Sequence, residues 1–157
     1  MTAPTTSMPP SALSPSSLMP ETKYRFSYRI RIENTSSDCI QVLGRHWNIQ
    51  EYDGDVSGAG NDSSSRKSHV SSRDPIIVNA PFTGAVGHLP VLKPGQCFEY
   101  MSGTDLATKL GLMKGHFYVA VVPPETPSLK SGDSVDELLQ TVDPFEATVE
   151  PFVLEAE

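Results

Sequence analysis

The sequence has little of what marks secreted, membrane-spanning or disulfide-stabilised proteins. Only two cysteines, Cys39 and Cys97, occur among its 157 residues. Its first 20 residues hold no charged side chain and no apolar core of the signal-peptide type. No run approaches the roughly 18 apolar residues that a membrane helix requires. We therefore expect a soluble cytoplasmic protein, with the nucleus as the alternative, in which both thiols are reduced.

Basic charge is scarce, and it is scarcest near the C-terminus. The formal net charge is −7. Residues 1–124 carry 11 lysines and arginines against 10 acidic residues, whereas residues 125–157 carry 1 against 9. A protein that binds duplex nucleic acid normally presents a basic face. We therefore expect no duplex nucleic-acid partner and no membrane binding, and we interpret the acidic end as an aid to solubility.

Composition divides the chain into a tail and one domain. Proline, serine and threonine dominate residues 1–22, which predicts a disordered tail. Residues 23–157 have the length of a single domain. Within it, the serine-rich residues 55–75 predict a flexible insertion. The acidic residues 125–143 form a second insertion, whose apolar spacing and capping box predict a short helix at Ser134–Val142.

Strand periodicity is clearest at residues 24–33, where aromatic and aliphatic residues alternate with polar ones. Farther along, the apolar residues change from even to odd positions at Gly44. This change predicts a β-bulge or a change of sheet near that glycine. In the last strand, Pro151 suits an edge position because proline has no N–H group to donate to a ladder.

Short strands separated by turn residues occur about seven or eight times, which predicts a sandwich. Ser102-Gly103-Thr104 predicts the end of one strand, and Gly111 and Gly115 predict turns before the next strand at residues 116–122. The residues that we expect in the core are aromatic or aliphatic: Phe26, Tyr28, Ile30, Ile32, Val42, Trp47, Ile49, Leu92, Phe98, Tyr100, Phe117, Val119 and Val121.

One long ordered pattern carries a family resemblance. It reads LKPGxxFxYxSGxxLxTxxGxMxG from Leu92 to Gly115, and it is accompanied by RHW at Arg45 to Trp47. With these motifs the chain resembles the ApaG family over residues 23–124 and 145–154. The resemblance implies an immunoglobulin- or fibronectin-III-like β-sandwich of two antiparallel sheets, with no settled biochemistry.

A glycine-rich segment lies where ApaG sequences often carry GxGxxG. Here Phe82 replaces the first glycine, leaving Gly84 and Gly87, with His88 next to them. A phosphate-binding loop also needs a helix behind it, and Pro90 with a following strand excludes one here. We interpret both glycines as turn residues and expect no cofactor.

Metal-binding and catalytic patterns are missing as well. The histidines show no HxH or HExxH spacing, and no CxxC is present, so we predict no metal site. His46 and His116 could still converge in space. Ser102 lacks the GxSxG context of a hydrolase nucleophile and has no base beside it in sequence. Cys97 is expected to be a packed thiol. We therefore expect no enzyme and no catalytic residue.

Two functions of different classes stay open. The resemblance implies a protein–protein interaction module, because relatives carry this domain inside F-box proteins and a polymerase-delta-interacting protein. The alternative is a sensor of a phosphorylated small molecule or a divalent metal ion, linked to magnesium and cobalt homeostasis. We expect a monomer or a weak homodimer, because exposed sheet edges permit pairing.

The expected binding face consists of loops at the ends of the sandwich. These loops are Gly84–Pro90 and Ser102–Gly115, with Arg45 beside them. Trp47 is either a core residue or, with Arg45, an anchor for a partner. The candidate residues are Arg45, Trp47, Gly84, Gly87, His88, Ser102, Gly103, Thr104, Lys109 and Lys114.

Overall fold

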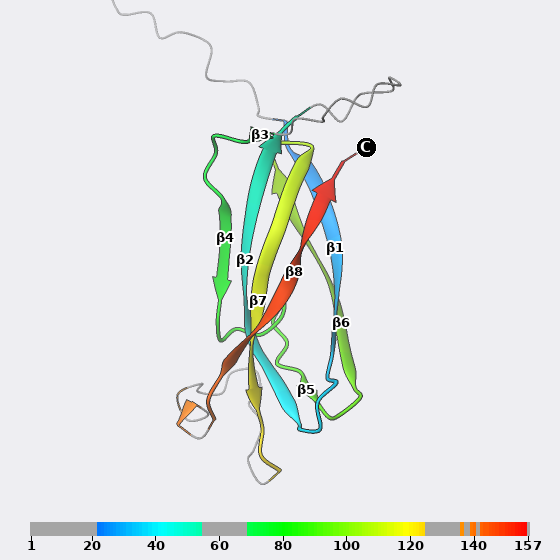
Figure 1. The fold of residues 1–157 in the computed structure, drawn as a ribbon, viewed down its shortest axis with the longest axis vertical. Coiled ribbons are helices and arrows are strands. Elements are labelled where there is room, and N and C mark those ends of the chain that lie inside the picture. Colours follow the sequence, from blue (N-terminus) through cyan, green and yellow to red (C-terminus); the bar gives the residue numbers. More distant parts are fainter. Residues whose placement is uncertain (1–21, 55–68, 125–135, 137–138, 141, 157) are drawn as a thin grey trace, which may run out of the picture.

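A computed structural model describes residues 22–54, 69–124, 136, 139–140 and 142–156, and apart from helical backbone at Asp136 and Leu139 its regular elements are β-strands (Figure 1). The strands confirm the predicted fold class. They are β1 (Tyr24–Glu33), β2 (Ile40–Asp53), β3 (His69–Val70), β4 (Ile76–Ala80), β5 (Val91–Leu92), β6 (Cys97–Leu106), β7 (Leu110–Val121) and β8 (Phe145–Glu155). None of the described residues belongs to a helix long and apolar enough to cross a membrane.

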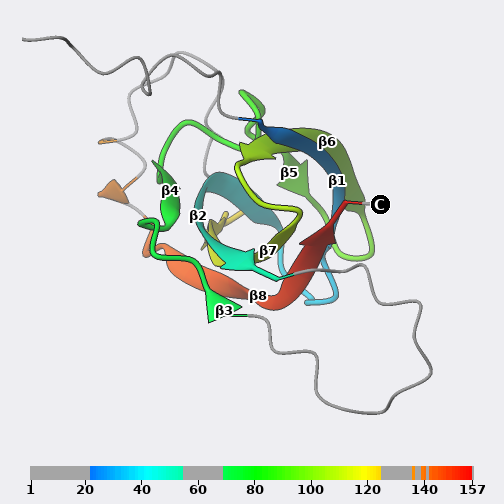
Figure 2. The same ribbon diagram turned by 90° about the horizontal axis from the view of Figure 1, so that it is seen from above.

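Two antiparallel sheets face each other (Figure 2). The small sheet consists of β1 and β6, which pair over ten residues. The large sheet has the order β3-β2-β7-β8. Its long strand β2 pairs with β7 on one edge, and on the other edge it pairs in turn with β5, β4 and β3. The strand β8 therefore lies at the edge of the large sheet, as Pro151 predicts.

The bulge predicted at Gly44 is present. The register between β2 and β7 shifts between Val42 and Gly44, so that Leu43 is the extra residue. Because of this shift, Val42 packs in the main core, whereas Leu43 packs on the opposite face of the sheet with Ala120 and Val142. A side chain at Gly44 would overlap the backbone of Ala80 and Pro81. The bulge thus lets the connection after β4 pass directly against β2.

Trp47 lies at the centre of the core and is 0% exposed. Its ring meets Phe117 edge to face at a centroid distance of 5.5 Å, and Phe152 at 6.3 Å. Most of the predicted core is confirmed as buried or half-buried. Val121 is the exception, because it is the last residue of β7 and remains 42% exposed at the end of the sheet. The sequence analysis missed eight buried hydrophobic residues: Leu43, Ala85, Leu106, Met113, Ala120, Val122, Val142 and Leu154.

The strand break predicted at Ser102-Gly103-Thr104 is wrong. β6 continues through these residues, which pair with Tyr28, Ser27 and Phe26 of β1. The ten-residue ladder between the two strands overrides the local turn preference. The turns predicted at Gly111 and Gly115 are also wrong, since both glycines lie inside β7.

Several predicted segments lie outside the described residues. These are the tail 1–22 apart from its last residue, the insertion up to Ser68, and most of the helix expected at Ser134–Val142. The end of the serine-rich segment forms β3, which pairs with Tyr52 and Asp53. At the other insertion, Val142 is buried against the large sheet.

Candidate functional site

Two histidines from distant parts of the sequence meet on the outer face of the large sheet. His46 of β2 is the register partner of His116 of β7. Their rings stack at a centroid distance of 5.1 Å with an interplanar angle of 12°. The convergence that the sequence left open is therefore confirmed. It follows from pairing between strands about 70 residues apart, which local sequence patterns do not reveal.

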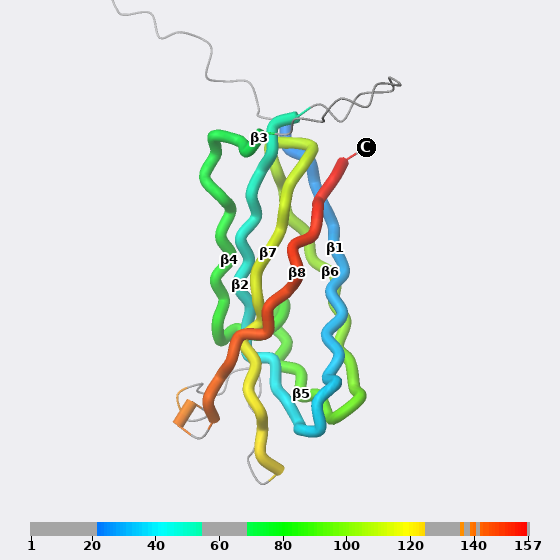
Figure 3. Tube along the Cα trace, in the orientation of Figure 1, coloured from blue at the N-terminus to red at the C-terminus, as the bar shows by residue number. Residues whose placement is uncertain are grey.

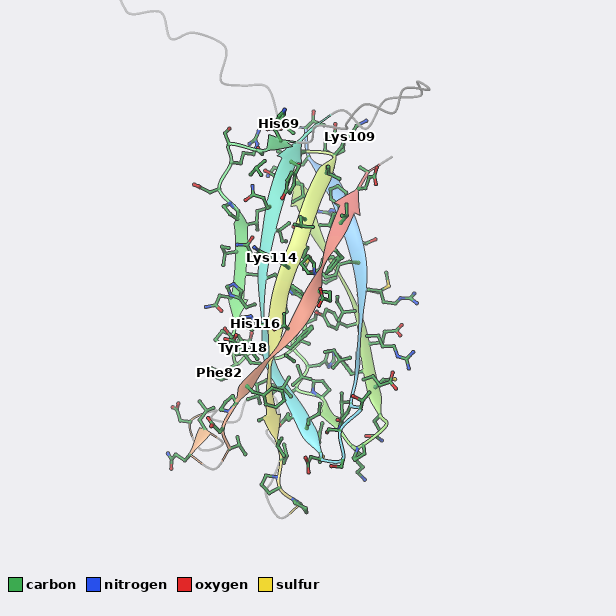
Figure 4. All side chains as sticks on the ribbon, viewed as in Figure 1. His69, Phe82, Lys109, Lys114, His116 and Tyr118 are labelled. Atoms are coloured by element: carbon green, nitrogen blue, oxygen red, sulfur yellow. The ribbon has the colours of Figure 1, made fainter. Side chains whose placement is uncertain are left out.

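Further rings extend this contact into a row. The ring of Tyr118 meets His116 edge to face at 4.8 Å, and Phe82 lies 6.3 Å from Tyr118. Figure 4 shows Lys114, His116 and Tyr118 in succession along β7, with Phe82 next to Tyr118. We call the four rings of His46, His116, Tyr118 and Phe82 the ring ladder. Phe82 is 37% exposed, and the other three are half-buried.

A polar side chain lies beside each of the two imidazoles. Nδ1 of His46 lies 3.2 Å from Oδ1 of Asn79. Nε2 of His116 lies 3.5 Å from Oε1 of Glu146, yet it has no hydrogen-bond partner among the described residues. Stacked imidazoles turn their faces to each other, so their nitrogen lone pairs do not converge on one point. Accordingly, no three His, Cys, Asp or Glu side chains of the described ranges form a group that could hold a metal ion.

A shallow depression of about 400 Å³ lies beside the histidine pair. It lies at an irregularity in the pairing of β7 and β8, whose register shifts between Met113 and Gly115. The depression combines a cation, hydroxyl and amide groups and two imidazoles: its polar lining comes from His46, Asn48, Lys114, His116 and Thr148. Such a lining can donate hydrogen bonds to an acidic group, and the ring ladder next to it offers apolar area.

The partner-anchor role considered for Trp47 is wrong, because this side chain is fully buried. Arg45 is half-buried and donates a hydrogen bond from Nη1 to the carbonyl of Gly84 at 2.9 Å. Arg45 thus holds the connection between β4 and β5 against β2.

The glycine-rich segment is a tight turn. Ala85 and His88 form an isolated β-bridge around Val86 and Gly87, both of which have positive φ angles, 53° and 78°. This is the pattern of a type I′ turn. Gly84 also has a positive φ, and a side chain there would overlap the carbonyl of His88. The ring of His88 lies 5.9 Å from Phe98, over the small sheet.

The remaining candidates do not form one face. Ser102, Gly103 and Thr104 lie within β6, and a depression of about 470 Å³ on the outer face of the small sheet includes the first two in its lining. Figure 4 shows Lys109 at one end of the molecule and Lys114 near the middle of the large sheet. The predicted loop Ser102–Gly115 is therefore wrong as a loop. Cys97, predicted to be packed, is exposed.

The ring ladder itself was missed as a unit. A usable signal was present on β7, where His116 and Tyr118 alternate with the core residues Phe117 and Val119. Two neighbouring rings on the outer side of one strand mark a candidate surface, because contiguous apolar area outside the core can indicate a contact site. Phe82 joins them from the connection after β4, and its contact with Tyr118 depends on the fold.

These features define an all-β sandwich domain whose larger sheet carries a row of rings on its outer face. Comparison with known proteins identifies the family. The sequence profile of the ApaG domain (DUF525) matches residues 15–67 and 64–121, which is more than half of the chain. The chain belongs to the ApaG domain family.

Individual relatives agree with this assignment. Protein ApaG of Shewanella pealeana is 40% identical over 97 residues, which cover 62% of this chain and 60% of that protein. Protein ApaG of Rhodospirillum centenum is 33% identical over 108 residues, 69% of this chain and 67% of that protein. The crystal structure of the putative ApaA protein from Bordetella pertussis superposes with a TM-score of 0.52 at 27% identity, covering 90% of this chain and 85% of that one. The match spans about 60% of the length of the Shewanella proteins.

Proposed function

We propose that this chain is a non-catalytic protein–protein interaction module, present in the cytoplasm, and that the ring ladder is its binding surface. The observation that carries the proposal is the continuous contact of four rings along one outward sheet face. Rings with a polar edge, such as tyrosine and histidine, give contact area at low entropic cost and keep a hydrogen-bonding group available.

The shape of the surface supports a protein partner. The depression beside the histidines is open and shallow, whereas small-molecule sites are usually clefts that bury most of their ligand. Lys114 is exposed at one end of the row and Phe82 at the other, so a partner would meet a charge and an apolar anchor on the same face. Aromatic anchors surrounded by polar groups are the usual centres of binding energy in interfaces.

The test uses affinity capture from extract with the full chain as bait. Phe82→Ala removes the most exposed ring and should abolish capture of a partner, because truncating an aromatic hot-spot residue costs about 2 kcal/mol or more. Val70→Ala is the matched control, since Val70 is 61% exposed on β3 and lies outside the ring ladder. Equal capture by both variants would refute the assignment of the surface.

A second function draws on the depression alone. Lys114, His116 and Thr148 could receive the acidic group of a phosphorylated ligand, as the sensor alternative requires. Thermal unfolding with Mg²⁺, Co²⁺ and ATP distinguishes the two functions, because only a ligand that binds the folded state raises the transition temperature. If the chain is an interaction module, none of these ligands should raise its unfolding temperature. A dose-dependent rise that disappears in Lys114→Ala would establish the sensor instead.

A further inference from the structure

The small sheet leaves one long strand edge open. In the part of the chain that the structure describes, β1 pairs with β6 alone. The far edge of β6 has the β4–β5 connection near it, since His88 lies over Phe98. The far edge of β1 lies toward β8 of the other sheet; the two strands approach each other near the C-terminal end of β8 and diverge toward its start (Figures 1 and 3). There, the rings of Tyr28 and Phe152 are 6.2 Å apart.

The backbone groups on this edge can be assigned from the ladder. The amide of Asn34 donates to the carbonyl of Gln96, on the β6 side, at 2.9 Å. Successive residues of a strand direct their N–H and C=O groups to opposite sides. The backbone N–H and C=O groups of the even-numbered residues of β1 therefore hydrogen-bond to β6. The odd-numbered residues, Ser27, Arg29 and Arg31 among them, direct their backbone groups to the open edge.

An apolar seam runs along the same edge. Tyr28, Ile30 and Ile32 of β1 face the core, yet they are only half-buried. Val149 and Phe152 of β8 are also half-buried on the facing sheet. A strand added next to β1 would place every second side chain between these two rows. Its apolar residues would then cover the seam.

The side chains on the outward face of β1 determine which charge is favoured on an added strand. Arg25, Arg29 and Arg31 form a row whose side chains are 84%, 65% and 59% exposed. Asp105 and Glu99 of β6 lie beside Arg25 and Arg29, and Glu33 lies two residues along β1 from Arg31. If a strand paired with the open edge of β1, its outward side chains would lie directly opposite these arginines. Opposite charges stabilise such cross-strand pairs, and like charges oppose them.

We propose that β1 accepts an extended segment of a partner protein by strand addition, a segment in which apolar residues alternate with aspartate or glutamate. A second copy of the chain satisfies fewer of these charges, because antiparallel pairing of β1 with itself about Arg29 would place Arg25 opposite Glu33 but Arg29 opposite Arg29. Residues 1–20 fit poorly, since they hold no acidic residue and their five prolines leave no stretch longer than four residues with continuous N–H donors.

This edge is separate from the ring ladder, so the two assignments can fail independently. The probe is a blocked nine-residue peptide of alternating glutamate and valine, compared with one in which lysine replaces glutamate. Residue-resolved amide exchange should show rapid exchange at Ser27, Arg29 and Arg31 in the free protein and slow exchange with the acidic peptide. Tyr28 and Ile30 should be slow in both states.

Variants separate backbone pairing from charge. Ser27→Pro removes an outward N–H without touching the ladder to β6, and Arg29→Glu reverses one charge of the row. Each should weaken binding of the acidic peptide about tenfold or more. Lys114→Glu makes the same change of charge on the other sheet and should leave binding unchanged, as should Phe82→Ala.

Three results would overturn the proposal. One is equal binding of the acidic and the lysine peptide. Another is binding of the acidic peptide to Ser27→Pro and Arg29→Glu with the same affinity as to the wild type. The third is slow exchange of the three outward amides in the free protein. Slow exchange that depends on protein concentration would mean that a second copy occupies the edge. Slow exchange at every concentration would mean that a segment of the same chain occupies it.

Discussion

Tyr100 places a hydroxyl group inside the sandwich, where it has no hydrogen-bond partner among the described residues. Burial raises the pKa of this phenol to about 12, because the phenolate would lose its hydration. An unfolded tyrosine ionises near pH 10. The unfolded state therefore releases the proton first, and the contribution of Tyr100 to stability is complete below pH 10 and is lost as the pH rises toward 12.

Tyr100→Phe should accordingly change stability differently at two pH values. At pH 8 we expect a free energy of unfolding equal to or slightly above that of the wild type, since an unpartnered buried hydroxyl is removed. At pH 11 the variant should gain on the order of 1 kcal/mol relative to the wild type. Urea unfolding at both pH values measures the difference. A difference that is the same at pH 8 and pH 11 would contradict this assignment.

Val86 is the one non-glycine residue with a positive φ in the described ranges. A β-branched residue is strained in this conformation, and it occupies the first central position of the type I′ turn. Val86→Asn creates the preferred Asn-Gly pair and should raise the free energy of unfolding by about 1 kcal/mol. Val121→Asn is the control, because Val121 is equally exposed at 42% but lies in a strand. That change should destabilise by up to about 1 kcal/mol, and stabilisation by both would refute the strain argument.

At the scale of elements, two glycines of β7 show how closely this strand packs against its neighbours. A side chain at Gly115 would overlap the backbone carbonyl of His46, whereas one at Gly111 would meet the end of the Leu106 side chain. Backbone of a paired strand cannot move aside, but a side-chain end can rotate. Gly115→Ala should therefore destabilise by about 3 kcal/mol, and Gly111→Ala by about 1 kcal/mol. Chemical denaturation measures both, and the reverse order would contradict the close packing of β2 and β7.

Elements also show what the sequence could predict. The alternation at residues 24–33 predicted β1 correctly, because one face of that strand is buried and the other is not. The change of phase at Gly44 likewise predicted the bulge, since a bulge is visible in the pattern of a single strand. Ser102-Gly103-Thr104 was misread, because its conformation is set by pairing with β1, about 75 residues away in sequence.

At the scale of the whole molecule, the candidate surface depends on contacts that no local pattern contains. His46, His116 and Phe82 come from two strands and a connection that the fold brings together. The sequence supplied the individual histidines as candidates, but it placed the binding face on loops at the ends of the sandwich. The predicted loop Ser102–Gly115 is mostly strand, and Trp47 is buried. The rings on the outer face of the large sheet are therefore the strongest candidate for the binding surface.

The central claim, that the ring ladder contacts another protein, is tested most directly by site-specific photo-crosslinking in cells. A photoreactive phenylalanine analogue replaces Phe82 in one version of the full chain and Val70 in another. The account predicts a discrete covalent adduct with another protein from position 82, a much weaker one from position 70, and loss of the adduct when Tyr118→Ala is added. Equal adducts from both positions, or an adduct at position 82 that persists in Tyr118→Ala, would contradict it.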